Sequence, residues 1–183
     1  MFNNIYYDIL SKKLLILGAL NYLAIPFFNI NLISKLGEFT HPYISIILYI
    51  IIGISGIYQI SKRDFYLPFL GQSVYPCGNL MEKVPQDATI IKTIKTTPNI
   101  NVIYWAAEPN TNVVENPWDA YDKNANSGVS KSDKDGNAIL QVRKPASYKI
   151  PYKNKELKPH IHYRECFNNS MLSPVKTIYL KKK

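Results

Sequence analysis

Beyond Asp64 the sequence lacks any stretch of helical length in which apolar residues recur every 3.6 positions. A bundle of amphipathic helices is therefore excluded for this part of the chain. Internal repeats and low-complexity tracts are also absent, so a repeat array is not expected.

Acidic residues are scarce, because 13 Asp and Glu face 22 Lys and Arg, which gives a net charge of +9. After residue 63 the cations exceed the acids by 17 to 11, and three of these cations are the terminal residues Lys181, Lys182 and Lys183. The lysines are scattered among acids, and no arginine cluster or nucleic-acid motif is present. We therefore expect a solvated basic surface close to acidic headgroups and no specific nucleic-acid site.

Charge is absent from two long hydrophobic runs. Residues 14–33 carry no charged side chain over 20 positions, and residues 43–60 carry none over 18. At about 1.5 Å per residue, each run is long enough to cross most or all of a hydrocarbon core about 30 Å thick. No small-x-small cleavage site follows the first run, so a cleaved signal peptide does not fit. We predict a two-helix membrane hairpin within residues 1–63; the alternative is a pair of buried helices in a soluble core.

Positive residues flank this hairpin on one side. Cations occupy residues 12–13 and 62–63, whereas the loop between the runs has little positive excess. The positive-inside rule then predicts a multi-pass membrane protein with both termini in the cytosol. In that compartment Cys77 and Cys166 are expected to be free thiols.

The first run also contains polar residues, including Asn21, Asn29 and Asn31. These side chains are costly against lipid, so we expect them to face the partner helix or to lie near the far interface. The stretch LILGALNYLAIPFFNINLI, followed by a second glycine-bearing span, resembles a family of small two-helix membrane proteins of unknown function. That resemblance implies anchoring and no particular chemistry.

Short runs with strand composition follow the hairpin, at residues 88–96, 101–106, 138–142, 161–163 and 175–180. Turn formers such as TTPN, AEPNTN, NANSG and SDKDG separate them. Short strands with frequent turns predict a β-sandwich for residues 88–183, preceded by an irregular arm at residues 64–87. In SDKDG, the twelfth position of a calcium loop would be Lys144, so we expect a hairpin turn instead.

The segment KPHIHY places His160 and His162 one residue apart in a chain with three histidines. Because side chains alternate between the two faces of a strand, both imidazoles are expected on one face, about 7 Å apart along the strand. Two such imidazoles can converge on a metal ion. A partly exposed histidine pair without a ligand is the alternative that the spacing leaves open.

The stretch SGVSKSDKDGNAILQVRKPASYKIPYKNKELKPHIHY, followed by SPVKTIYL, resembles intradiol ring-cleavage dioxygenases, a β-sandwich family that uses non-haem Fe(III). The family's order is a T-D-x-D-G turn, a strand, P-G-x-Y and P-x-H-I-H. The resemblance implies iron bound by Tyr148, His160 and His162, with Tyr121 as the best candidate for a second tyrosinate. Leu157 stands where the family usually has an arginine that stabilises charge on the substrate.

Three functional hypotheses follow. The first is a membrane-anchored ferric dioxygenase, an oxidoreductase that opens a catechol-type ring. The second is a structural protein that tethers a membrane to a protein shell, with little or no catalysis. The stretches YWAAEP, NPWDAY and PHIHY resemble intradiol-like proteins of large DNA viruses, which implies a minor capsid protein, virion protein partners and an internal virion membrane. A third hypothesis, metal-free carbohydrate or protein binding, leaves the four candidate ligands unexplained.

Overall fold

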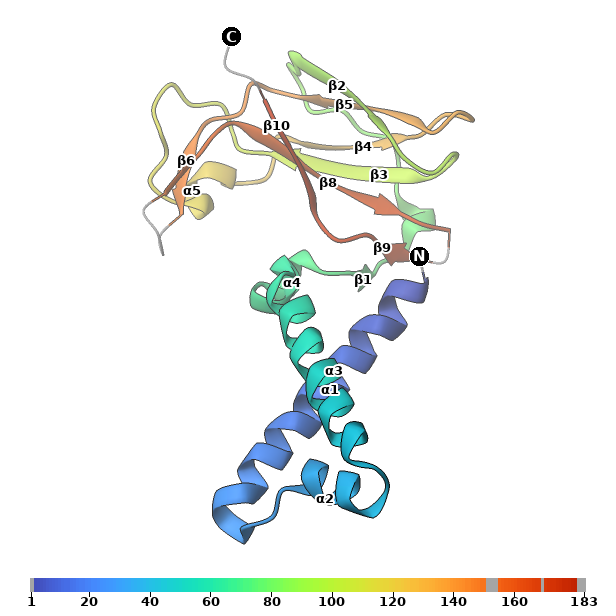
Figure 1. Ribbon diagram of the computed structural model, residues 1–183. Helices are drawn as coiled ribbons and strands as arrows, with labels where there is room; N and C mark the ends of the chain where they lie inside the picture. Colours follow the sequence, from blue (N-terminus) through green and yellow to red (C-terminus); the bar gives the residue numbers. More distant parts are fainter. Residues whose placement is uncertain (1, 151–154, 169, 181–183) are drawn as a thin grey trace. The chain divides into compact units, whose positions relative to one another are not determined.

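The computed structural model describes residues 2–150, 155–168 and 170–180, and the three terminal lysines lie outside this part of the chain (Figure 1). The chain divides into two compact units, Met1–Pro68 and Phe69–Lys183. The first unit is helical and the second is rich in β-strands.

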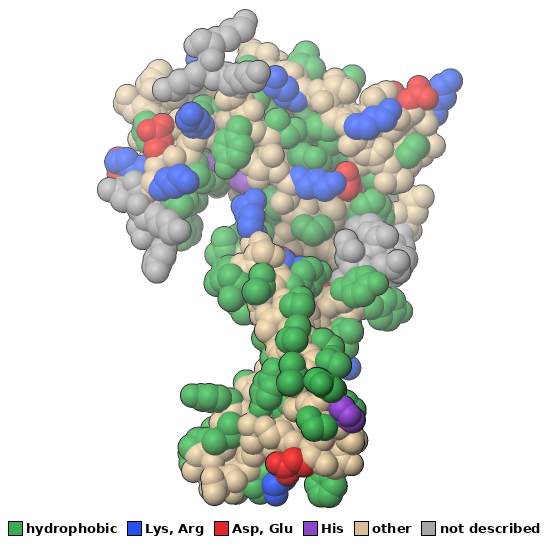
Figure 2. Space-filling view, viewed as in Figure 1, with side chains coloured by type: hydrophobic (Ala, Val, Ile, Leu, Met, Phe, Trp, Pro, Cys, Tyr) green, Lys and Arg blue, Asp and Glu red, His purple; other side chains and the backbone are tan. Residues whose placement is uncertain are grey.

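The first unit contains α1 (Phe2–Phe28), α2 (Leu32–Phe39), α3 (Pro42–Ile60) and α4 (Arg63–Tyr66). Two segments, Ile5–Phe28 and Pro42–Ile60, are long and apolar enough to cross a membrane. Only 11% of each apolar window is buried within the protein, which does not fit two core helices of a soluble domain. Hydrophobic side chains accordingly cover much of the visible surface of these helices (Figure 2).

The first span differs from its predicted bounds because the chain leaves the helix at residue 29. Asn29 has a φ of 53°, in the left-handed region that ends helices, and Asn31 caps α2 by accepting a hydrogen bond from Ser34 N. The predicted asparagines bond within the hairpin, since Asn21 Oδ1 accepts from Ile33 N at 3.0 Å and Asn31 Oδ1 accepts from Tyr49 OH at 2.8 Å.

Helices α1 and α3 approach each other closely. A Cβ atom added to Gly18 on α1 would lie 2.7 Å from a methyl group of Ile52 on α3, so a larger residue would push the helices apart. In the N-terminal part of α1, Asp8 pairs with Lys12 of the same helix and with Lys62, which follows α3. These two lysines are among the four cations on which the predicted orientation rests.

The described residues of the second unit form ten strands and three short helical segments. The main sheet has the order β1-β9-β8-β3-β4, with β10 also paired to β8, and two smaller sheets are formed by β2-β5 and β6-β7. All of these strand pairs are antiparallel. The bounds are η1 Pro68–Leu70, β1 Ser73–Val74, η2 Cys77–Asn79, β2 Ile90–Lys95, β3 Asn101–Ala106, α5 Pro117–Tyr121, β4 Ser127–Lys131, β5 Asn137–Val142, β6 Tyr148–Ile150, β7 Lys155–Leu157, β8 His160–Cys166, β9 Met171–Leu172 and β10 Lys176–Tyr179.

One hydrophobic core joins the main sheet to the β2-β5 sheet. Alternate residues of β3 and β5 are buried in it, as expected for strands with one face turned inward. Fully burying one large apolar side chain contributes about 1.5–3 kcal/mol. The buried members are Ile94, Val102, Tyr104, Ala106, Ala138, Leu140, Val142 and Ile161.

The five predicted strands all coincide with observed ones, but β1, β4, β6, β7 and β9 were not predicted. Strand β4 has the sequence SGVSK, which has little strand propensity and is held by pairing with β3. The SDKDG turn is also not a hairpin turn, because β4 and β5 belong to different sheets. Asp133 Oδ1 accepts hydrogen bonds from the backbone N–H groups of Asp135 and Asn137, and Gly136 adopts a φ of 80°.

The prediction of free thiols is wrong, because Cys77 and Cys166 form a disulfide. Their Cα atoms are 5.7 Å apart, within the range that a disulfide can bridge, and both residues are buried. The bond joins the predicted arm to the end of β8. The arm is ordered further by the pairing of β1 with β9 and by the hydrogen bond from Asn101 Nδ2 to Cys77 O.

Candidate metal centre

Strand β8 positions the two histidines. It lies between β3 and β10, and its His162 faces Trp105 on one neighbour and Thr177 on the other. Ile161, between the histidines in sequence, is fully buried in the core, while the imidazoles contact each other on the opposite face. The alternation predicted from the His-x-His spacing is therefore present.

Two other segments supply the tyrosines. Tyr121 is the last residue of α5, a short helix that starts at Pro117 and is capped by Asn116, whose Oδ1 accepts from Asp119 N at 2.9 Å. Tyr148 is the first residue of β6 and is buried beside Ala107 and Ala120, with the partly buried Tyr121 packed against the same cluster. Elements far apart in sequence thus bring both phenols to one place.

The four predicted ligand residues form one connected group. The phenol oxygens of Tyr121 and Tyr148 are 3.1 Å apart, and Tyr148 OH lies 3.2 Å from His160 Nε2. His160 Nε2 is in turn 3.1 Å from His162 Nε2. The structure therefore brings together all four side chains, including Tyr121, the candidate for the second tyrosinate.

The outer nitrogens of the imidazoles fix how the rings are presented. His160 Nδ1 lies 2.6 Å from the carbonyl oxygen of Lys158, and a carbonyl can only accept, so this nitrogen carries a proton. In the neutral ring, Nε2 then presents its lone pair to Tyr148 and His162. His162 Nδ1 lies 2.9 Å from Thr177 Oγ1, which can accept or donate. Such outer hydrogen bonds are typical of histidines that bind metals.

The three successive distances within this group, 3.1, 3.2 and 3.1 Å, match those between neighbouring ligand atoms of a metal ion. Two ligand atoms that are each about 2.1 Å from an ion and at right angles around it lie about 3.0 Å apart. Two phenols and two imidazoles form a hard-to-borderline donor set that suits ferric iron. Among the described residues, no group of three or more His, Cys, Asp or Glu side chains is arranged to hold a metal, so this centre depends on its tyrosines.

The environment of Tyr121 disfavours its anionic form when no cation is near. Burial raises the pKa of the Tyr121 phenol well above its ordinary value, and the hydrogen bond with Tyr148 raises this pKa further. A phenolate here therefore needs a positive charge close by, and a bound cation would supply it.

The position where the family resemblance implies an arginine is apolar but lies beside the group. Leu157 pairs with Tyr148 across the β6-β7 ladder and packs against the same cluster. Two arginines of this unit are committed elsewhere: Arg143 pairs with Glu108 at 2.6 Å, and Arg164 donates to backbone carbonyls. Neither replaces the missing charge.

Sequence reasoning missed three residues around the centre. The ring of Trp105 lies 5.5 Å from that of His162, and the ring of Tyr179 lies 5.4 Å from that of His160. Thr177 and Tyr179 alternate along SPVKTIYL, and both face the histidines because β10 pairs with the start of β8. The strand pattern was visible in the sequence, but its pairing partner was not.

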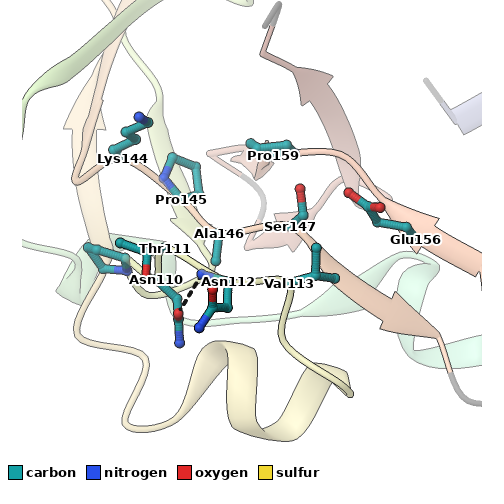
Figure 3. A pocket seen from close by; sticks show the side chains of 11 residues that line it. Asn110, Thr111, Asn112, Val113, Lys144, Pro145, Ala146, Ser147, Glu156 and Pro159 are labelled. Atoms are coloured by element: carbon teal, nitrogen blue, oxygen red, sulfur yellow. Dashed lines mark hydrogen bonds between the residues drawn. The ribbon is translucent and has the colours of Figure 1, made fainter.

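A cavity of about 850 Å³ is lined by residues adjacent in sequence to Tyr148 and His160, but none of the four predicted ligand residues lines it. Ser147 and Pro159, which precede Tyr148 and His160, are in its wall (Figure 3). Lys144 and Glu156 supply opposite charges to the same wall. The cavity is open, its wall combines apolar and polar residues, and it is separate from the group of Tyr121, Tyr148, His160 and His162.

Comparison with known proteins concerns the hairpin. A family model described as a domain of unknown function (DUF378) matches residues 6–63, about a third of the chain. No curated protein matches the chain. The match fits the two-helix region and ends before the β-rich unit, so the N-terminal part is similar to this family. Tyr121, Tyr148, His160 and His162 lie outside the matched residues.

Proposed function

We propose that the protein is a membrane-anchored metalloprotein whose β-rich unit binds Fe(III) through Tyr121, Tyr148, His160 and His162. The observation that carries this proposal is the convergence of four donor atoms from α5, β6 and β8, with successive distances of 3.1, 3.2 and 3.1 Å. The unit would then be intradiol-dioxygenase-like, as the sequence resemblance implies.

Bound ferric iron would activate a catechol-type diol so that O₂ can open its ring. The protein's own contribution would be to orient the imidazoles through Lys158 O and Thr177 and to exclude water with apolar neighbours such as Leu157. Without an arginine at residue 157, charge developing on the substrate would be poorly stabilised. We therefore propose that iron binding is strong and turnover slow.

The second candidate function is a structural tether between a membrane and a protein shell, such as a minor capsid role. It is favoured by exposed apolar side chains near the start of the β-rich unit, where Phe69, Val74 and Met81 are 72%, 77% and 79% exposed. Exposed apolar side chains that gather in one segment are typical of protein contact surfaces. The disulfide between Cys77 and Cys166 would keep this segment attached to the sheet when force is applied through the tether.

Two observations disagree about the orientation of the hairpin. The flanking cations predict cytosolic termini, whereas a disulfide favours an oxidising compartment. A disulfide persists only where thiols are not kept reduced, whereas the distribution of Lys and Arg around spans is a statistical bias. We therefore propose that the β-rich unit faces an oxidising side, opposite to the orientation expected from charge alone.

Labelling in sealed membranes tests this orientation. Lys35→Cys places a thiol on an exposed position of the helix between the spans, and the native cysteines are already paired. An impermeant thiol reagent added on the oxidising side should leave this cysteine unlabelled until the membrane is opened. Labelling before opening would place the loop on that side and overturn the proposed orientation.

The iron proposal is tested with the full-length protein in detergent, titrated with ferric iron. The wild type should take up one equivalent and become coloured by charge transfer from phenolate to iron. Tyr148→Phe should remove most of this absorbance, whereas Tyr163→Phe should keep it, because Tyr163 lies on β8 outside the group. A wild type that stays colourless and takes up no iron would contradict the proposal. The structural tether would then be the remaining candidate function.

A further inference from the structure

We propose that Thr177 is a positioning residue that prepares the histidine pair for a metal ion by accepting a hydrogen bond from Nδ1–H of His162. This inference rests on the proposed iron centre. Thr177 lies directly opposite His162 across the β8-β10 ladder, and its Oγ1 is 2.9 Å from His162 Nδ1. Among the described residues, this is the only side-chain hydrogen bond that Thr177 makes.

The need for such a residue follows from the contact between the two imidazoles. Their Nε2 atoms are 3.1 Å apart, and His160 Nε2 presents a lone pair in the neutral ring because Lys158 O holds the proton on Nδ1. If His162 carries its proton on Nε2, that proton points at His160 and occupies the space of the metal. If His162 carries it on Nδ1, two lone pairs converge and attract a cation.

Thr177 can stabilise the tautomer of His162 that binds a metal. A hydroxyl can donate to Nδ1 or accept from it, so it tolerates both forms and favours the Nδ1–H form once a cation binds at Nε2. The main chain fixes the corresponding partner of His160, whereas the partner of His162 is a side chain that substitution can remove. Substituting Thr177 therefore tests how much the hydrogen bond to His162 Nδ1 contributes to metal binding.

The test uses full-length protein in detergent micelles and three variants. Thr177→Val keeps the branched shape and removes the hydroxyl, Thr177→Ser keeps the hydroxyl, and Thr93→Val makes the same change at an exposed position of β2. Iron affinity is measured by competition with a chelator. Thr177→Val should bind iron roughly 10- to 100-fold more weakly, the usual loss when such an outer partner is removed. The other two variants should bind like the wild type.

A second measurement separates positioning from simple loss of fold. Protein labelled with ¹⁵N-histidine is loaded with Ga(III), a diamagnetic substitute for Fe(III), and only three histidines contribute signals. The wild type and Thr177→Ser should show a slowly exchanging proton on His162 Nδ1, and this protection should be lost in Thr177→Val. The metal-free variants should unfold at the same temperature as the wild type.

The outcomes distinguish the two proposals. Wild-type protein that binds neither iron nor gallium contradicts the iron centre and, with it, the role of Thr177. Wild-type protein that binds iron while Thr177→Val binds it equally well overturns the positioning role alone. A Nε2-protonated His162 in the gallium-loaded wild type would overturn it as well.

Discussion

The phenol oxygen of Tyr148 lies 3.2 Å from Nε2 of His160, although the two side chains come from different sheets. Tyr148 starts β6 in a two-stranded sheet, and His160 starts β8 in the main sheet. This contact joins the tyrosine half of the candidate centre to its histidine half.

Tyr121→Phe should weaken the centre without disrupting the fold. The change deletes a hydrogen bond with Tyr148 and one anionic ligand, so the free energy of unfolding should fall by only about 1 kcal/mol. Iron titration should show weaker binding and an altered absorption band. Equal affinity and an unchanged spectrum would show that Tyr121 is not a ligand.

Leu157→Arg should raise turnover of a catechol-type substrate by the iron-loaded protein. The new guanidinium would lie beside Tyr148 and stabilise negative charge on the substrate. Steady-state oxygen consumption measures the effect, and Leu157→Met serves as a control of similar size without charge. If both variants are as slow as the wild type, the catalytic hypothesis loses support and the tether gains it.

Replacing both cysteines, as Cys77→Ser with Cys166→Ser, should destabilise the β-rich unit. The disulfide spans 89 residues, and closing a loop of that length stabilises a fold by about 4–5 kcal/mol in the chain-entropy model. Thermal unfolding with and without reductant is the measurement. The double variant should match the reduced wild type, and an unfolding temperature equal to that of the oxidised wild type would contradict the prediction.

Asp133 should make the stability contributed by the turn before β5 depend on pH. Hydrogen bonds from the Asn137 side chain and backbone lower the pKa of Asp133 from its ordinary value of 3.8. Because the folded pKa is the lower one, the stabilisation is present above pH 3.8 and is lost as the pH falls through the folded value. Asp133→Asn should therefore be less stable than the wild type at pH 7, with a smaller difference at pH 3. Asp135→Asn is the matched control, and a difference that stays constant with pH would refute the link.

The sequence was sufficient where one residue pattern determines one structural property. Two uncharged runs predicted the spans, and the spacing of His160 and His162 predicted a shared face. Features that depend on distant pairing were missed, such as β4, whose composition is turn-like and whose partner is β3. The disulfide was missed because the oxidation state of Cys77 was inferred from lysines near the spans, whereas its partner is brought close only by the folded sheet.

The central claim, that tyrosine and histidine side chains of this unit bind one ferric ion, is tested most directly by resonance Raman spectroscopy. Full-length protein loaded with iron is excited within its visible absorption band, with ordinary and with ring-deuterated tyrosine. The account predicts enhanced phenolate ring vibrations that shift on deuteration and disappear in Tyr148→Phe. A visible band without tyrosine vibrations, or no band after iron is added, would contradict it.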